Sequence, residues 1–300
     1  MHIKLITSFK PNTWSTYAER GINAMCENLP KQVDLCVYYE DTRPEYDNER
    51  INWIDLHAEE PDLVSFKSKY KNDPIANGKL DTIPNGVRRS ANLQGKDKDN
   101  VSFLWDAVKF SNKVFCIINA VKNSSEYDYV VWLDADTFIF KPMPIGFLAN
   151  LLQPDTMLTY LGRDTIYPEC GFVGYNLKHR ETQNFINDWK KLYTTGNIFQ
   201  LDEWHDSAVF WHLVKIYLEE RTVIVNDIGY KKGVEGHHVF INSDLGNYID
   251  HMKGNRKQKG FSSPVKDLRL VGGAAPKHKL GYWNEARKKE NLHYKGKFNE

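Results

Sequence analysis

The sequence predicts an α/β fold in which a mixed, mostly parallel sheet is flanked by helices within a single domain. Two passages of the chain carry this prediction. The first has the order of a β-α-β unit, which builds parallel sheets: strand Ile3–Phe9, helix Thr16–Leu29 and strand Val33–Tyr39. The second leads from a helix at Phe103–Val121 into an apolar strand at Val130–Leu133. With 300 residues, 41% of them apolar, the chain can bury a substantial core.

Shorter elements are expected around this frame. Residues 43–100 are predicted to form a less regular insertion, because they are polar, contain Pro and Gly, and have a strand-like pattern only at Ile51–Leu56. Beyond Pro142 the pattern predicts a helix, a strand, a glycine-containing segment, an amphipathic helix and an apolar helix, in this order: Ile145–Leu152, Met157–Leu161, Tyr167–Asn176, Thr182–Tyr193 and Trp204–Leu213.

Asp134 and Asp136 follow the apolar strand directly. Residues i and i+2 of an extended chain point to the same side, so both carboxylates can face one point. A hard divalent cation takes such oxygen ligands. The bare pattern is weak evidence, since Asp97-Lys98-Asp99 repeats it in a polar run that we interpret as a solvated loop. Carboxylates at the end of a buried strand need a partner charge. We therefore favour a metal site, with a helix-cap or turn role as the alternative.

Further contacts are expected at the same edge of the sheet. Ligands of parallel α/β units bind at the carboxyl ends of the strands. Thr7, Ser8 and Phe9 end the first strand and are candidate ligand-binding residues. Lys109 and Lys113 lie four apart on the helix that leads to the aspartates. Lys113 is a candidate for contacting a phosphate, and an ordinary surface position is the alternative.

Two more carboxylates are candidates for catalysis. Glu169 precedes Gly171, where a strand is expected to pass close to a pocket, although a surface turn explains it equally well. Asp206 is expected inside the apolar helix, where a free carboxylate needs a reason. The alternative is that it caps or hydrogen-bonds its own helix. Capping is sufficient to explain Asp202 or Glu203, since the helix dipole favours acids in the first turn.

Residues 248–260 are interpreted as a metal- and phosphate-binding segment. Neutral imidazole is a common metal ligand, so His251 is a candidate third ligand, and Lys257 can neutralise a phosphate. A solvated loop is the alternative for both. His237 and His238 lack such neighbours and are interpreted as structural.

Composition narrows the class of protein. The net charge of +1 favours no charged partner. The four cysteines show no C-x-x-C spacing, which is typical of a reducing compartment. No apolar run approaches membrane-spanning length, and the first residues lack the apolar core of a signal peptide. These features predict a cytoplasmic protein without a transmembrane segment.

The motifs resemble those of GT-A glycosyltransferases, a Rossmann-like fold of enzymes that use nucleotide-diphosphate sugars with manganese or magnesium. The strand ending in Asp134-Ala135-Asp136 resembles their D-x-D motif. His251-x-x-Gly254-x-x-Lys257 is similar to the H-x-x-G-x-x-K signature of the retaining, glycogenin-like and lipopolysaccharide galactosyltransferase-like branch. That branch continues with Pro-Trp, where this chain has Gln258-Lys259. Three segments also look like bacterial and phage proteins described as glycosyltransferases: 6–41, 109–176 and 204–210.

The resemblance implies a metal-dependent enzyme that transfers a sugar from a nucleotide-diphosphate sugar to a hydroxyl acceptor, with retention. The acceptor is a glycan, a small molecule, a protein or a modified nucleic acid. Asp136 and His251 are implied as ligands of Mn²⁺ or Mg²⁺, and Asp134 as a ligand that also contacts ribose. Gly254 and Lys257 are implied to bind the diphosphate. Asp206 is the expected carboxylate beside the anomeric carbon, with Glu169 in reserve.

Two other functions are weighed against this one. A nucleotide-sugar pyrophosphorylase needs a glycine-rich basic loop straight after the first strand, and Thr7–Thr13 has none. A nucleic-acid-binding module could use the basic residues near the C-terminus, and it would show steep salt dependence. Those residues are Lys253, Arg256, Lys257 and Lys259.

Overall fold

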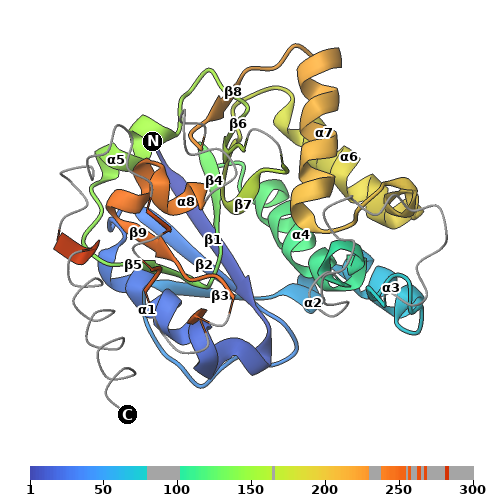
Figure 1. Cartoon of the computed structure of the whole chain (residues 1–300), viewed down its shortest axis with the longest axis horizontal. Coiled ribbons are helices and arrows are strands. Elements are labelled where there is room, and N and C mark those ends of the chain that lie inside the picture. The colour runs from blue at the N-terminus through green and yellow to red at the C-terminus, as the bar shows by residue number, and fades with distance from the viewer. Residues whose placement is uncertain are drawn as a thin grey trace, which may run out of the picture.

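A seven-stranded sheet runs through the middle of the molecule (Figure 1). The computed structural model describes residues 1–79, 102–163, 166–229, 238–254, 256–257, 262–264, 267–268 and 281–283. The strand order is β3-β2-β1-β4-β7-β6-β8. Only β7 runs antiparallel to its neighbours in this sheet, so the predicted mixed, mostly parallel sheet is confirmed. The strands are β1 (Ile3–Phe9), β2 (Val33–Tyr39), β3 (Ile51–Asp55), β4 (Tyr129–Leu133), β6 (Leu158–Leu161), β7 (Glu169–Asn176) and β8 (Val225–Asp227).

Helices cover both faces of the sheet and bury an apolar core on each (Figure 1). One face packs against α1 (Glu19–Asn28), α5 (Ile145–Leu151) and α8 (Val239–Asn242). The other packs against α2 (Leu56–Glu59), α3 (Pro61–Tyr70), α4 (Ala107–Lys122), α6 (Thr182–Thr195) and α7 (Asp206–Glu220). A π-helical turn at Trp14–Ala18 leads into α1, and 3-10 turns lie at Pro11–Thr13, Ser102–Trp105, Asn197–Gln200 and Asp244–Asn247.

A second, two-stranded sheet joins distant parts of the chain. It pairs β5 (Thr137–Ile139) with β9 (Ile249–His251) in antiparallel fashion. Thr137 lies opposite His251, and the Met252 amide donates to the Asp136 carbonyl at 3.2 Å. The segment predicted to bind metal is therefore held beside the aspartates by backbone pairing.

Within residues 43–100, β3 matches the strand-like pattern expected at Ile51–Leu56, and α2 and α3 are helices that the sequence pattern did not indicate. Asp55 caps α2 by accepting from the His57 and Ala58 amides. In α3 the buried residues are Leu63 and Phe66, too few for a clear apolar period. Residues 80–101, including the second Asp-x-Asp, lie outside the described part of the chain.

Within the described residues, no helix is both long and apolar enough to cross a membrane. The cysteines Cys26, Cys36, Cys116 and Cys170 are all free thiols.

Candidate active site

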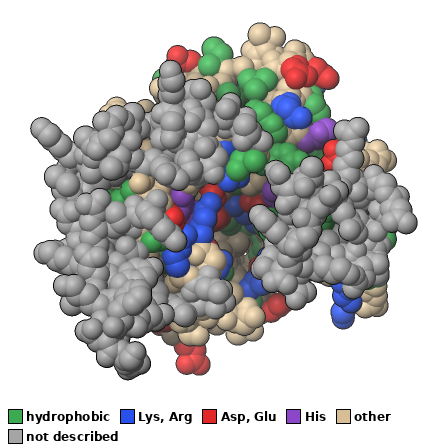
Figure 2. Space-filling view, viewed as in Figure 1, with side chains coloured by type: hydrophobic (Ala, Val, Ile, Leu, Met, Phe, Trp, Pro, Cys, Tyr) green, Lys and Arg blue, Asp and Glu red, His purple; other side chains and the backbone are tan. Residues whose placement is uncertain are grey.

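A cavity opens where the order of the sheet reverses. β1 pairs in parallel with β2 on one side and with β4 on the other, and ligands of α/β sheets bind at the carboxyl ends of such strands. The cavity has a volume of about 540 Å³, and residues that follow both strands line it, among them Lys10, Asp134 and Asp136. Figure 2 shows basic, acidic and histidine side chains gathered in a hollow near the centre of one face.

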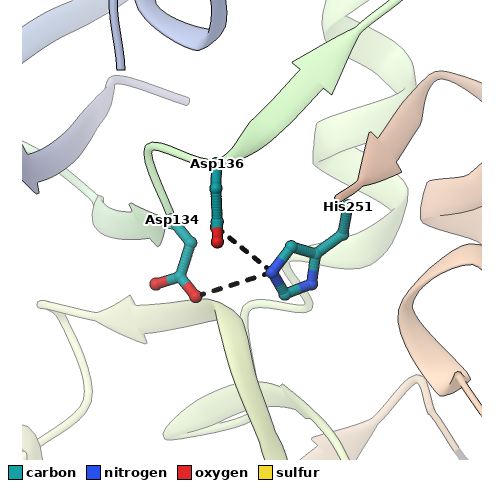
Figure 3. Close-up of side chains that lie close together, drawn as sticks. All are labelled: Asp134, Asp136 and His251. Carbon is teal, nitrogen blue, oxygen red and sulfur yellow. Dashed lines mark ion pairs between the residues drawn. The ribbon is translucent and has the colours of Figure 1, made fainter. Parts of the chain in front are cut away.

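Asp134, Asp136 and His251 converge at the cavity (Figure 3). His251 Nε2 lies 3.2 Å from Asp136 Oδ1 and 3.9 Å from Asp134 Oδ2. One ligand atom from each residue lies within 4.8 Å of the others. Two carboxylates and one imidazole suit manganese better than calcium. His251 Nδ1 is buried without a hydrogen bond and lies 3.9 Å from Glu169 Oε1, a third carboxylate near the ring that can orient it. The donor set therefore fits a divalent metal ion.

Two basic side chains, His251 and Lys257, favour the ionised form of Asp136. Lys257 Nζ donates to Asp136 Oδ2 at 3.0 Å, on the oxygen that His251 leaves free. Burial alone would raise the pKa of Asp136, but His251 and Lys257 together lower it. Conversely, Asp136 outweighs the effect of burial on His251 and raises the pKa of the imidazole. A metal held by Asp134, Asp136 and His251 would supply positive charge between the two carboxylates.

Asp134 belongs to a second charged group, centred on Lys113. The Lys113 ammonium lies 2.9 Å from Asp134 Oδ1 and 2.7 Å from Asp206 Oδ2, and it donates to the Cys170 carbonyl at 2.8 Å. The Trp132 indole also donates to Asp134 Oδ1, at 2.7 Å. Burial raises the pKa of Asp134, whereas the two carboxylates raise that of Lys113 against the effect of burial. Lys113 thus bridges the metal site and the proposed catalytic carboxylate.

Asp206 lies in the expected helix, but at its first residue. α7 begins at Asp206 itself, so this residue occupies the first turn, while Asp202 and Glu203 lie outside the helix. No side chain caps the helix at His205. Asp206 is buried and lines the cavity. Burial opposes its ionisation, but Lys113 and His205 lower its pKa.

Glu169 lines the same cavity at the start of β7 and forms an ion pair with Lys253. Burial would raise its pKa, but Lys253 and His251 hold it at about 2. The surface-turn interpretation is wrong, since Glu169 is buried.

The remaining predicted residues divide into two groups. Ser8, Phe9 and Lys257 line the cavity, whereas Thr7 is fully buried and is not part of the lining. Gly254 is exposed with a φ of +62°, a conformation that favours glycine, and its carbonyl accepts from the Lys257 amide at 3.3 Å. Gly254 therefore shapes the turn that presents Lys257.

The sequence analysis missed cavity residues on the turns after β1. Asn12, Thr13, Thr16 and Tyr17 line the cavity, and the Tyr17 ring lies 4.9 Å from Lys257 Nζ. These residues fall in the 3-10 and π-helical turns of Pro11–Ala18. Such turns carry no periodic signal: the sequence predicts no element for Asn12 and Thr13, and it places Thr16 and Tyr17 at the start of the helix expected at Thr16–Leu29.

The absence of a side chain at Gly171 leaves room for the ring of His251. A Cβ at Gly171 would lie 3.1 Å from His251 Cε1 and 3.3 Å from Phe240 Cδ2. We expect Gly171→Ala to displace the imidazole and weaken Mn²⁺ binding by about tenfold or more, the range for residues that orient a metal ligand. Electron paramagnetic resonance titration of the donor-free protein measures this. Gly146→Ala is the control, because a Cβ there meets nothing within 4 Å. Equal metal affinities in both variants would contradict the arrangement.

Glu40 at the end of β2 makes stability depend on pH. It is buried at the cavity, 3.9 Å from Lys67, and burial raises its pKa from 4.5 to about 7. The folded state therefore keeps a proton that the unfolded chain releases above pH 4.5. The resulting stabilisation is fully present below that pH and is lost as the pH rises through about 7.

We expect Glu40→Gln to become more stable relative to the wild type as the pH rises over this window. Thermal unfolding across the pH series measures the difference, with the exposed Glu219→Gln as control. Parallel curves for Glu40→Gln and the wild type would show that Glu40 titrates normally.

Comparison with known proteins gives distant structural likenesses only. No family model matches the chain, and no curated protein matches it. A solved glycosyltransferase involved in the glycosylation of the major capsid of PBCV-1 is similar with a TM-score of 0.41 and 11% identity, over 87% of this chain and 100% of that one. Mouse xyloside xylosyltransferase 1 in its apo form is similar with a TM-score of 0.42 and 9% identity, over 75% and 84%. The bifunctional glycosyltransferase WbbM in its apo form gives 0.40 and 11%, over 96% and 51%. At these values the likenesses carry no argument about activity.

Proposed function

We propose that the protein is a metal-dependent GT-A glycosyltransferase that moves a sugar from a nucleotide-diphosphate sugar to a hydroxyl acceptor, with retention. The observation that carries the proposal is the convergence of Asp134, Asp136 and His251 at the switch point of the sheet, with Lys257 on the same carboxylate. Two carboxylates, an imidazole and an ammonium at one cavity suit a divalent ion together with a diphosphate.

Each residue has a role that its position supports. Asp134, Asp136 and His251 would hold Mn²⁺ or Mg²⁺, which when bound would supply positive charge to a leaving diphosphate. Lys257 reaches the cavity from the turn at Gly254 and would contact the diphosphate. Ser8 and Phe9 line the cavity beside them and would contact the donor.

Lys113 and Asp206 would act on the side of the transferred sugar. Lys113 is held by Asp134 and Asp206 and keeps its charge inside the cavity. Asp206 stays ionised beside it, so the carboxylate is suited to stabilise positive charge that develops at the anomeric carbon. Glu169 is the reserve for this role and is neutralised by Lys253. In retention without a covalent intermediate, the leaving phosphate takes the proton of the acceptor hydroxyl.

Carboxylates pair with most of the basic residues near the C-terminus, which disfavours the nucleic-acid alternative. Lys253 pairs with Glu169, Lys257 with Asp136 at 3.0 Å, and Arg256 with Asp267 at 2.5 Å. Three of the four basic residues that would contact a phosphate backbone are therefore already bound to carboxylates.

A screen of nucleotide sugars with and without Mn²⁺ tests the proposal. We expect one donor to raise the melting temperature, and to be hydrolysed slowly, only when metal is present. The proposal would be contradicted if no donor raised the melting temperature, or if a chelator did not stop the hydrolysis. If a donor is consumed only when pyrophosphate is added, the protein is a nucleotide-sugar pyrophosphorylase instead.

A further inference from the structure

We infer that His205, held by Glu203, is a positioning residue that fixes the carboxylate of Asp206 at the cavity. The inference rests on the proposed function in one respect, the role of Asp206 beside the transferred sugar. Neither His205 nor Glu203 is among the residues that line the cavity, so both would act through Asp206.

The backbone before α7 is fixed on both sides. The Trp105 indole donates to the Asp202 carbonyl at 2.9 Å, and the Trp204 amide donates to the Leu104 carbonyl at 2.7 Å. The Trp204 indole closes the turn by donating to the Leu201 carbonyl at 2.9 Å. These bonds fix the backbone that carries Glu203 and His205.

Aromatic rings fix the plane of the imidazole. Three of them lie edge-on to His205 with ring centroids 5.4 to 6.1 Å away: Phe103, Phe110 and Tyr167. Edge-to-face packing of this kind restricts ring rotation and excludes water. His205 is buried, with 7% of its surface exposed.

The imidazole lies between two carboxylates. Its Nε2 is 3.0 Å from Glu203 Oε2, and its Nδ1 is 3.9 Å from Asp206 Oδ1. Lys113 holds the other oxygen of Asp206 at 2.7 Å, so a basic side chain faces each oxygen of that carboxylate. Asp206 and Glu203 outweigh the effect of burial and raise the pKa of His205. The other titratable group packed on the ring is the Tyr167 phenol.

A purely structural ion pair is a poor explanation for this group. Buried charge triads add little net stability compared with well-packed apolar side chains. Here the charges lead from Glu203 through His205 to a carboxylate that faces the cavity. The arrangement instead keeps Asp206 ionised and in one orientation before a substrate binds, which is how oriented carboxylates support catalysis.

A double-mutant cycle between Glu203→Gln and Asp206→Asn tests the inference. We expect Glu203→Gln to lower kcat by about 10- to 100-fold, as for other residues that orient a functional group, and to leave the KM for the donor within about twofold. In the Asp206→Asn background the same change should have no further effect. Glu60→Gln is the control, because Glu60 is a buried carboxylate that binds Asn119 and Lys190 and does not line the cavity. Equal losses in both backgrounds, or an unchanged kcat, would overturn the inference.

A second measurement does not depend on sugar transfer. We expect ¹⁵N spectra of the donor-free protein, recorded over a pH series, to show His205 losing its second ring proton at a higher pH than a free imidazole does. Either Glu203→Gln or Asp206→Asn should lower the pH at which the ring loses its proton. A wild-type His205 that titrates like a free imidazole, with no shift in either variant, would refute the inference, whether or not the protein transfers a sugar. A charged, coupled His205 in a protein that turns over no donor would contradict only the proposed function.

Discussion

Replacing Asp136 by Asn is expected to remove metal-dependent donor turnover almost completely. Asp136 is a proposed direct ligand, and even residues that only orient ligands cost 10- to 100-fold when changed. We therefore expect a loss of more than about 100-fold. The variant also leaves His251 and Lys257 without the carboxylate that both contact at 3.2 and 3.0 Å. Donor hydrolysis measured over a Mn²⁺ titration, with the metal affinity from electron paramagnetic resonance, tests both effects.

The matched control for this variant is Asp47→Asn. The Asp47 side chain is 98% exposed and pairs only with Arg43 among the described residues, so its loss should change neither metal affinity nor turnover. A turnover in Asp136→Asn that stays near the wild-type value and still depends on Mn²⁺ would remove Asp136 from the metal site.

Asp206→Asn is expected to reduce sugar transfer by about 10²- to 10⁴-fold, the range for a positioned carboxylate that acts in the transition state. The variant keeps the shape of the side chain and removes its charge. Lys113 retains Asp134 and the Cys170 carbonyl as partners, so the fold and donor affinity should change little. Turnover per folded molecule and donor affinity by calorimetry separate these effects.

Asp188→Asn is a suitable control, because Asp188 accepts from the Tyr217 hydroxyl at 2.8 Å away from the cavity. It should cost stability without changing turnover per folded molecule. If Asp206→Asn shows that same behaviour, the carboxylate is only structural. The anomeric configuration of the product, read by NMR, tests retention independently: inversion would refute it.

The strands and the position of the aspartates could be predicted because their signals are local. Val130–Leu133 is apolar throughout and fully buried between β1 and β7, so composition alone indicates a central strand. Asp134 and Asp136 both fall within the three residues that follow this apolar run. Short elements, and elements with an irregular apolar pattern, were predicted wrongly or not at all. β5 and β9 have three residues each, and α3 buries too few apolar residues to show a period.

The partners of the aspartates were decided by tertiary structure. Lys257 reaches Asp136 across 121 positions of sequence, and His251 arrives through the pairing of β9 with β5. Spacing along the chain carries no information about such contacts, so residue chemistry and the motif resemblance, rather than periodicity, pointed to His251 and Lys257. Nothing in the sequence indicated that Lys113 would bridge Asp134 and Asp206, or that His205 would lie between Glu203 and Asp206. The apolar pattern determined the sheet, whereas the charges that surround the cavity depend on which strand ends and helix starts the folded chain brings together.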